Sequence, residues 1–218
     1  MGRLITILLV DDHELVRTGI RRILESSDEF QILGEASSGE EALDLVGKLR
    51  PAIVLMDVNM PGIGGIEATH RITHIHPEVK VIVVTVLSDA PFPRQLHDAG
   101  AMGYLTKGCP AEDMFQAIRS VFRGQPYISS EVARRRSLAS LNGVDGDSPF
   151  NTLSQREMQV MMMIVQGQKT QDIADSLFLS PKTVSTYRQR LYSKLNVETD
   201  VELAHMALRY GLTGNIST

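Results

Sequence analysis

Five residues of this chain have side chains that could together carry out phosphoryl chemistry: Asp11, Asp12, Asp57, Thr85 and Lys107. Three carboxylates placed side by side would repel one another and raise each other's pKa unless a cation lay among them. Carboxylate oxygens are hard ligands, and Mg²⁺ commonly binds one or two of them together with water and phosphate oxygens. An aspartate nucleophile beside a lysine ammonium and a threonine hydroxyl then predicts a site that forms an acyl phosphate.

The segments around these residues predict how they come together. Short apolar segments alternate with amphipathic ones through the first 125 residues, and the strand candidates are Ile5–Val10, Gln31–Ala36, Ile53–Met56, Val79–Val84 and Met102–Leu105. The helix candidates are Glu14–Glu25, Glu40–Leu49, Ile66–Ile75 and Pro110–Arg123. Strands that are apolar throughout indicate a parallel sheet covered on both faces. We therefore predict an α/β domain that is flavodoxin-like and doubly wound, with a five-stranded parallel sheet of order 2-1-3-4-5.

The reactive residues follow these strands at their carboxyl ends. In chain order they are Asp11-Asp12, Asp57 with Asn59, Thr85, and Tyr104 with Lys107. The carboxyl ends of parallel strands meet at one edge of the sheet, where ligands bind in such folds. We therefore expect these side chains to form a single site.

The rest of the chain has a different character. Residues 129–149 are rich in Ser, Gly and Asp, and helical periodicity alone follows them, in Ser154–Gln166, Thr170–Leu177, Pro181–Leu195 and Thr199–Tyr210. Helix ends are marked by Thr170 and Ser180 as N-cap candidates, Pro181 at a first helical position, and Gly167 and Gly211. We expect an α/β domain over residues 1–126, a linker over 127–149 and a small all-α domain over 150–218.

Two of these helices have the spacing of a helix-turn-helix. Only three residues separate Thr170–Leu177 from Pro181–Leu195, and the second helix would be the one that enters a DNA groove. Between Lys182 and Lys194 the chain contains four basic residues and no acid, although its formal net charge is −4. Arg188, Arg190 and Lys194 could neutralise phosphates there. Such a local basic stripe suits nucleic acid, whereas residues 1–128, which are acidic overall, do not.

The composition excludes some classes of protein. With 43% hydrophobic and 22% charged residues it is typical of a globular protein with an apolar core. No apolar segment reaches the roughly 18 residues of a membrane helix, so we expect no membrane association. The N-terminal apolar segment ends in acids without a cleavage site, and a single cysteine excludes an intramolecular disulfide. These features predict a cytoplasmic protein.

Residues 3–125 resemble the receiver domain of two-component response regulators, through LLVDDHELVR, LMDVNMPGIGG, VIVVTV and GYLTKG. The resemblance implies that Asp57 accepts a phosphoryl group from a sensor histidine kinase. It implies a Mg²⁺ site formed by the side chains of Asp11, Asp12 and Asp57 and the backbone carbonyl of Asn59.

The same resemblance implies a switch. Lys107 would pair with the phosphoryl oxygens, Thr85 would move to hydrogen-bond them, and Tyr104 would turn inward into the vacated space. Two departures from the family affect the detail of this region. Val86 stands where the family often has a small residue, and Pro91 and Pro93 predict a short or late-starting fourth helix.

Residues 152–197 are similar to the LuxR/FixJ-type (NarL family) DNA-binding domain, through LSQREMQVMMMIVQGQKTQDIADSLFLSPKTVSTYRQRLYSKLNV. By that match the base-reading positions are Ser185, Thr186 and Gln189. The contacts to the DNA backbone would be Lys182, Thr183 and Arg190. Tyr187 stands where the family usually has His. The last helix, Thr199–Tyr210, is apolar beyond one face, which suits a homodimer on a palindromic site of double-stranded DNA.

Taken over nearly the whole chain, the motifs most resemble the GacA/UvrY-type global regulators. That resemblance implies a hybrid sensor kinase as partner, dimerisation on phosphorylation, and control of the transcription of small regulatory RNA genes. The chain would then be a regulator and not an enzyme.

Two other functions fit some of the same residues. A haloacid-dehalogenase-type phosphotransferase also has an aspartate nucleophile, but it needs a second acid two residues later, and that position is Asn59. A DNA-binding protein with a degenerate receiver is the second alternative. The joint presence of Asp11, Asp12, Asp57, Thr85 and Lys107 opposes it.

Overall fold

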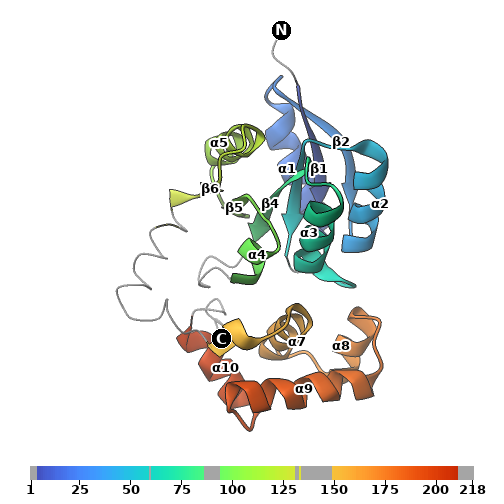
Figure 1. Cartoon of the computed structure of the whole chain (residues 1–218), viewed down its shortest axis with the longest axis vertical. Helices are drawn as coiled ribbons and strands as arrows, with labels where there is room; N and C mark the ends of the chain where they lie inside the picture. Colours follow the sequence, from blue (N-terminus) through green and yellow to red (C-terminus); the bar gives the residue numbers. More distant parts are fainter. Residues whose placement is uncertain (1–3, 59, 86–93, 131–132, 134–148, 211–218) are drawn as a thin grey trace. The chain divides into compact units, whose positions relative to one another are not determined.

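The computed structural model describes residues 4–58, 60–85, 94–130, 133 and 149–210. The chain divides into two compact units. One contains a parallel β-sheet flanked by helices, and the other contains the C-terminal helices (Figure 1). Among the helices of the described residues, none is long and apolar enough to cross a membrane.

The sheet has six strands, whereas we expected five. They are β1 (Ile5–Val10), β2 (Phe30–Ala36), β3 (Ile53–Asp57), β4 (Lys80–Thr85), β5 (Gly103–Thr106) and β6 (Tyr127–Ile128), in the order β2-β1-β3-β4-β5-β6 with every pair parallel. The prediction of five was wrong because β6 has only two residues, too few to show a periodicity. It pairs with β5 and lies at the start of the segment we expected to be a linker.

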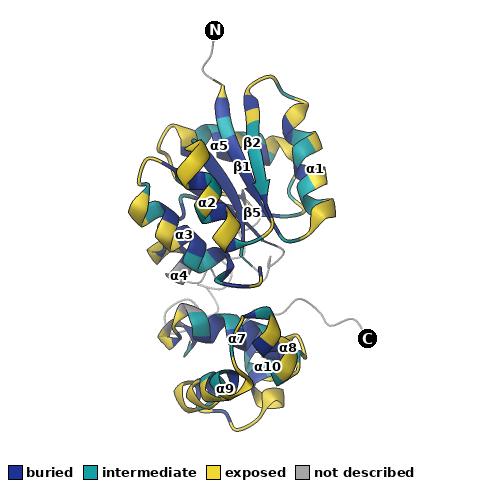
Figure 2. Cartoon of the chain, turned by 90° about the vertical axis from the view of Figure 1, so that its right-hand side faces the viewer, coloured by how far each residue is buried: buried dark blue, intermediate teal, exposed yellow. Residues whose placement is uncertain are grey.

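Helices cover both faces of the sheet. On one face α1 (Glu14–Glu25) and α5 (Ala111–Phe122) pack against Ile5, Ile7 and Leu9 of β1. On the other, α2 (Gly39–Leu49) and α3 (Gly64–Ile75) pack against Leu8 and Val10. Figure 2 shows β1 buried between helices whose outer faces are exposed, whereas the edge strand β2 is mostly of intermediate burial. Alternate residues of β1 and β3 therefore enter two apolar cores, which is why the middle of each central strand is apolar on both faces.

A short helix was expected after the fourth strand, and the described helix there, α4 (Arg94–Asp98), has five residues. Pro91 and Pro93, on which that expectation rested, lie outside the described residues, as does Val86.

The C-terminal unit contains a 3₁₀ turn η1 (Pro149–Thr152) and four α-helices among the described residues: α7 (Gln155–Val165), α8 (Thr170–Ser176), α9 (Pro181–Leu195) and α10 (Asp200–Arg209). Most of the predicted ends are confirmed. Ser180 caps α9 by accepting from the Thr183 N–H, Pro181 is its first residue, and Gly167 follows α7 with a φ of 80°. Gly211 lies outside the described residues.

Thr170 is not an N-cap, so that prediction was wrong. The N-cap of α8 is Lys169, whose backbone N–H donates to the Asp172 carboxylate at 3.3 Å. The Asp172 carboxylate thus accepts a backbone N–H at this end of the helix. The Thr170 hydroxyl does not cap the helix and instead accepts a hydrogen bond from Arg188.

The turn between α8 and α9 contains a strained residue. Phe178 has a φ of 52°, in the left-handed region, and is 82% exposed. A bulky residue pays a steric cost in that conformation, whereas asparagine adopts it more readily. Asn196, at the C-cap of α9 with a φ of 53°, shows the favourable choice at a comparable position.

Phe178→Asn should therefore raise the free energy of unfolding of the C-terminal unit, by up to about 1 kcal/mol. Urea denaturation followed by circular dichroism measures this. The matched control is the reverse exchange, Asn196→Phe, which should lower it by a similar amount. A loss of stability in Phe178→Asn would show that the exposed ring makes contacts worth more than the strain.

Candidate functional site

The acids expected at the strand ends do lie together. Asp57 is the last residue of β3 and Asp11 directly follows β1, its neighbour in the sheet. Ligand atoms of Asp11, Asp12, His13 and Asp57 all lie within 4.8 Å of one another. Asp11 and Asp57 are buried, with 3% and 1% of their surface exposed. Two buried carboxylates this close require positive charge nearby.

Lys107 provides such a charge. Its Nζ lies 2.7 Å from Asp11 Oδ2 and 3.0 Å from Asp57 Oδ2. Partial burial lowers the pKa of Lys107, but the hydrogen bonds and charges of the two aspartates outweigh burial and leave the pKa raised. The lysine therefore stays an ammonium ion, held between the two carboxylates.

Thr85 and Tyr104 border the same edge of the sheet. Thr85 is the last residue of β4, is 7% exposed, and accepts the Lys107 backbone N–H on its carbonyl at 2.9 Å. Tyr104 is buried in β5, and its hydroxyl donates to the Ala101 carbonyl at 3.4 Å. The strand pairing thus brings Thr85 and Lys107 together, as expected, with the Tyr104 ring already inside the protein.

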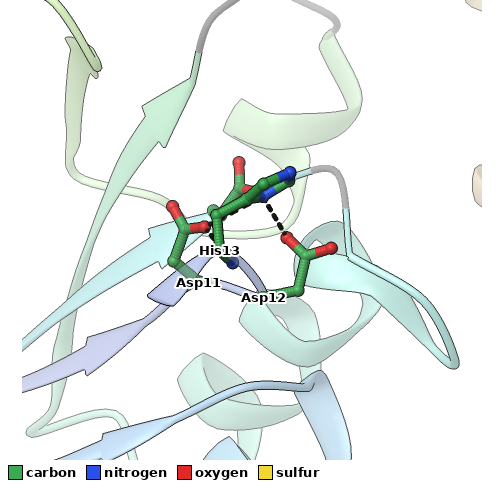
Figure 3. A group of neighbouring side chains, drawn as sticks. Asp11, Asp12 and His13 are labelled. Carbon is green, nitrogen blue, oxygen red and sulfur yellow. Dashed lines mark hydrogen bonds and ion pairs between the residues drawn. The ribbon is translucent and has the colours of Figure 1, made fainter. Parts of the chain in front are cut away.

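His13 is a member of this group that the sequence analysis did not select. Its backbone N–H donates to Asp11 Oδ1 at 2.8 Å, and its Nδ1 lies 2.8 Å from Asp12 Oδ1. Figure 3 shows the imidazole beside both carboxylates. Asp57 is the fourth member of the same group. Its position directly after two acids was the only sequence feature that could have indicated a place in this group. The same position equally suits an N-cap, and His13 is also the N-cap of α1.

Glycines shape the loop that follows Asp57. A Cβ on Gly65 would lie 1.8 Å from the Asp57 carbonyl oxygen, so no other residue fits without moving the backbone. The Gly65 N–H donates to the Val58 carbonyl at 3.1 Å, and the Ile63 N–H donates to Glu40 of α2 at 3.0 Å. Asn59, whose carbonyl we expected to bind a cation, lies outside the described residues.

These donors suit a metal ion. Asp11, Asp12 and Asp57 offer carboxylate oxygens around one point, and one lysine ammonium contacts two of them. Three negative charges against one positive leave a net negative pocket, which favours a cation. Asp12, with 28% of its side chain exposed, leaves this cluster open to solvent. The pocket can therefore bind a metal ion.

The second candidate surface is the face of α9. Lys182, Ser185, Thr186, Gln189 and Arg190 are all exposed there, and Thr183 is partly so. The Ser185 and Thr186 hydroxyls donate to carbonyls one turn earlier, at 2.9 and 3.0 Å. These are weak local bonds that a ligand can replace.

Arg188 and Lys194, which we expected to contact phosphates, make contacts within the C-terminal unit. Arg188 Nη2 lies 2.5 Å from Asp200 Oδ2, and Arg188 Nη1 donates to Thr170 at 3.1 Å. Lys194 Nζ lies 2.6 Å from Glu157 Oε2 and donates to the Thr152 carbonyl at 3.1 Å. Both side chains therefore tie α9 to its neighbours.

Tyr192 joins the Arg188 network. Its hydroxyl donates to Asp200 Oδ1 at 2.5 Å. Burial, followed by the hydrogen bond and charge of Asp200, raises the pKa of Tyr192 to about 12. Asp200, the first residue of α10, thus holds two side chains of α9.

Known families match both units. Residues 7–119 match the response regulator receiver domain, and residues 151–207 match the bacterial regulatory proteins of the luxR family. The chain is 53% identical to the response regulator GacA of Pseudomonas viridiflava, over 96% of this chain and 98% of the relative. It is 50% identical to the response regulator UvrY of Escherichia coli K12, over 96% of each. The chain belongs to the LuxR-type response regulators.

A solved structure of this family extends the comparison to DNA. RcsB of Salmonella enterica serovar Typhimurium, bound to the rprA promoter in the presence of the phosphomimetic BeF₃⁻, is 25% identical with a TM-score of 0.66, over 94% of this chain and 98% of that one. The response regulator described here is thus a DNA-binding transcription regulator and not an enzyme, which sets the phosphotransferase alternative aside. Its receiver domain implies a histidine kinase as partner.

Proposed function

We propose that Asp57 accepts the phosphoryl group from the sensor histidine kinase. A carboxylate oxygen of Asp57 attacks phosphorus, the bond from phosphorus to the histidine nitrogen breaks, and an acyl phosphate forms while the kinase recovers its imidazole. The observation that carries this assignment is the position of Asp57: it is buried, lies in the acidic group, and has the Lys107 ammonium 3.0 Å from one oxygen. That ammonium can pair with the new phosphoryl oxygens.

We propose Mg²⁺ as the ion of the pocket, because the nearby ligands are mainly hard carboxylate oxygens. Asp11, Asp12 and Asp57 would hold it, with the Asn59 carbonyl as the further expected ligand. The ion would neutralise charge on the transferred group. Thr85 would then hydrogen-bond the phosphoryl oxygens, and Tyr104 would occupy the space behind it. Their places at the end of β4 and within β5 support such a coupled movement.

Asp57→Asn should abolish labelling by acetyl phosphate in the presence of Mg²⁺, because the amide cannot form an acyl phosphate. Phosphate-affinity electrophoresis of the full chain measures this. The exposed Asp44→Asn on α2 is the control and should label normally. Labelling that persists in Asp57→Asn would identify another acceptor, and no labelling of the unmodified chain would favour the degenerate-receiver alternative.

For DNA, we propose that Ser185, Thr186 and Gln189 read base edges while Lys182, Thr183 and Arg190 contact the backbone. Exposure of this face of α9 supports the assignment. Arg188 and Lys194 then have a different role from Lys182 and Arg190, because their charges are already paired with acids within the domain. They hold α9 in place.

Substitution of Arg190 should therefore affect DNA binding, whereas substitution of Arg188 should affect the stability of the domain. Arg190→Ala should weaken DNA binding at all sequences and reduce the slope of log K against log salt by about one, without changing thermal stability. Arg188→Ala should lower the stability of the C-terminal domain by up to about 1 kcal/mol, because α9 loses one of its two bonds to the exposed Asp200 carboxylate. Fluorescence anisotropy at several salt concentrations and thermal melts separate the two. Equal salt slopes would show that Arg188 also contacts phosphate.

We propose that the phosphorylated protein is a homodimer and that α10 contributes to the contact. Val201 and Leu208, seven residues apart on α10, are 65% and 54% exposed. A spacing of seven places both on one face of the helix. Two apolar side chains there are available to a second copy in an isologous contact.

Val201→Asp with Leu208→Asp should reduce dimer formation by acetyl-phosphate-treated protein, because the contact would bury like charges. Analytical ultracentrifugation measures the dimer fraction. Ile75→Asp, at an exposed apolar residue of α3, is the matched control and should leave it unchanged. A monomer that persists after phosphorylation of the unmodified chain would contradict the dimer proposal itself.

We propose domain limits close to those expected: a receiver from residue 1, a linker ending at 149, and a DNA-binding domain over 150–218. Because β6 pairs with β5, the receiver extends two residues past 126. From the resemblance to the GacA/UvrY-type regulators we further propose a hybrid kinase as partner, small regulatory RNA genes as targets, and the cytoplasm as location.

A further inference from the structure

Arg17 on α1 contacts the backbone of the acidic pocket. Its Nη1 donates to the carbonyl oxygen of Asp11 at 2.6 Å, and its Nε donates to Glu35 Oε2 on β2 at 3.0 Å. Only 15% of its side chain is exposed. The guanidinium thus joins the turn after β1 to the neighbouring strand through a planar set of donors.

Hydrogen bonds hold the peptide groups on both sides of Asp11, and Arg17 holds the one between Asp11 and Asp12. The Asp11 N–H donates to the Ala36 carbonyl at 3.1 Å, and the Asp11 C=O accepts from Arg17. Because Asp12 follows that carbonyl directly, rotation of this peptide would redirect the Asp12 carboxylate. Arg17 opposes the rotation.

A bulge in β2 places Glu35 where Arg17 can reach it. Ile7 pairs with Ile32 while Leu8 pairs with Gly34, so Leu33 is an extra residue. Ile32 packs into the core beneath α1 and α5, whereas Ala36 packs beneath α2 and α3. An even number of residues from Ile32 to Ala36 would normally put both on one face. The bulge reverses the alternation, which directs Glu35 toward α1.

Glu35 is a charged anchor shared by two arginines. Arg17 binds Oε2, and Arg21, one helical turn further along α1, donates to Oε1 at 2.7 Å. Partial burial raises the pKa of Glu35, but the hydrogen bonds from Arg21 and Arg17 outweigh burial and leave the pKa lowered. Arg21 also pairs with Glu25 at 3.3 Å, on the side of α1 away from its N-terminal turn.

We propose that Arg17, oriented by Glu35, is a positioning residue of the pocket: it fixes the Asp11–Asp12 peptide and so sets the affinity for the cation. The proposal rests on the proposed function, because it assumes that the pocket binds a divalent cation. Arg17 touches neither the ion nor the phosphoryl group, and it acts through the backbone.

Arg17→Met and Arg21→Met form a matched pair for the test. Each removes one positive charge and the contact of that charge with Glu35, and Arg21→Met also removes the pair with Glu25. Only Arg17→Met removes the bond to the Asp11 carbonyl. Loss of a positive charge alone would strengthen cation binding, so a weaker affinity must come from lost geometry. In the full chain, Mn²⁺ binding is measured by electron paramagnetic resonance and Mg²⁺ binding by competition.

We expect Arg17→Met to weaken Mn²⁺ and Mg²⁺ binding about tenfold, and Arg21→Met to stay within about twofold of the unmodified chain. Labelling by acetyl phosphate should need correspondingly more Mg²⁺ in Arg17→Met but reach the same rate at saturation. Glu35→Gln should shift in the same direction. Arg17→Lys should recover part of the affinity, because one ammonium can reach the Asp11 carbonyl.

Equal affinities in Arg17→Met and Arg21→Met would overturn the proposal. If Arg17→Met lowers Tm more than Arg21→Met does, the comparison is made with Arg17→Lys and Glu35→Gln instead. Normal cation affinity in both of these variants would overturn the proposal. Absence of cation binding in the unmodified chain would remove the proposed Mg²⁺ site and this inference with it. Normal binding in every variant would remove the inference alone.

Discussion

The Lys107 ammonium between Asp11 and Asp57 is the interaction on which the receiver depends. Two carboxylates that are almost fully buried would be costly without it, since each loses its hydration. Three separate chain segments must meet to form this arrangement: the end of β1, the end of β3 and the residue after β5. A parallel sheet achieves that because all its strands end at one edge. The requirement for such an edge explains why the strands are parallel, apolar and covered by helices on both faces.

Residues outside the pocket keep that edge in place, and they come from α1, β2, α2 and α3. Gly65 allows α3 to approach the Asp57 carbonyl, and Glu40 of α2 holds the loop that precedes α3. The bulge in β2 directs Glu35 to Arg17, which holds the Asp11 carbonyl. Gly65, Glu40 and Arg17 act on the backbone, so the pocket carboxylates remain available to a cation. The pocket is therefore preorganised by its supports while its charged groups stay available.

Much of this could be predicted from residues in sequence, because strand ends and reactive residues coincide. Asp57 follows an apolar strand, and parallel pairing alone brings it beside Asp11. The strand β6 could not be predicted, since two residues carry no periodicity. Nor could the role of Glu35, because a one-residue bulge reverses which face a side chain occupies and leaves no local signal. Thr170 was predicted as an N-cap, but α8 begins at Thr170 and its N-cap is Lys169, whose N–H donates to the Asp172 carboxylate.

The basic residues of α9 likewise show that sequence alone does not reveal which charges are paired in the folded domain. From sequence, Lys182, Arg188, Arg190 and Lys194 form one group of equivalent cations. In the folded domain Asp200 and Glu157 neutralise Arg188 and Lys194, whereas Lys182 and Arg190 are exposed and make no ion pair with another described residue. Acids distant in sequence thus decide which basic residues of α9 have their charge paired within the domain. In the proposed DNA complex, the pairing of these two cations would weaken the attraction of α9 for phosphate, but it would also fix the orientation of the helix that carries Ser185, Thr186 and Gln189. Sequence recognition needs that orientation, because base edges are read by direction as well as by charge.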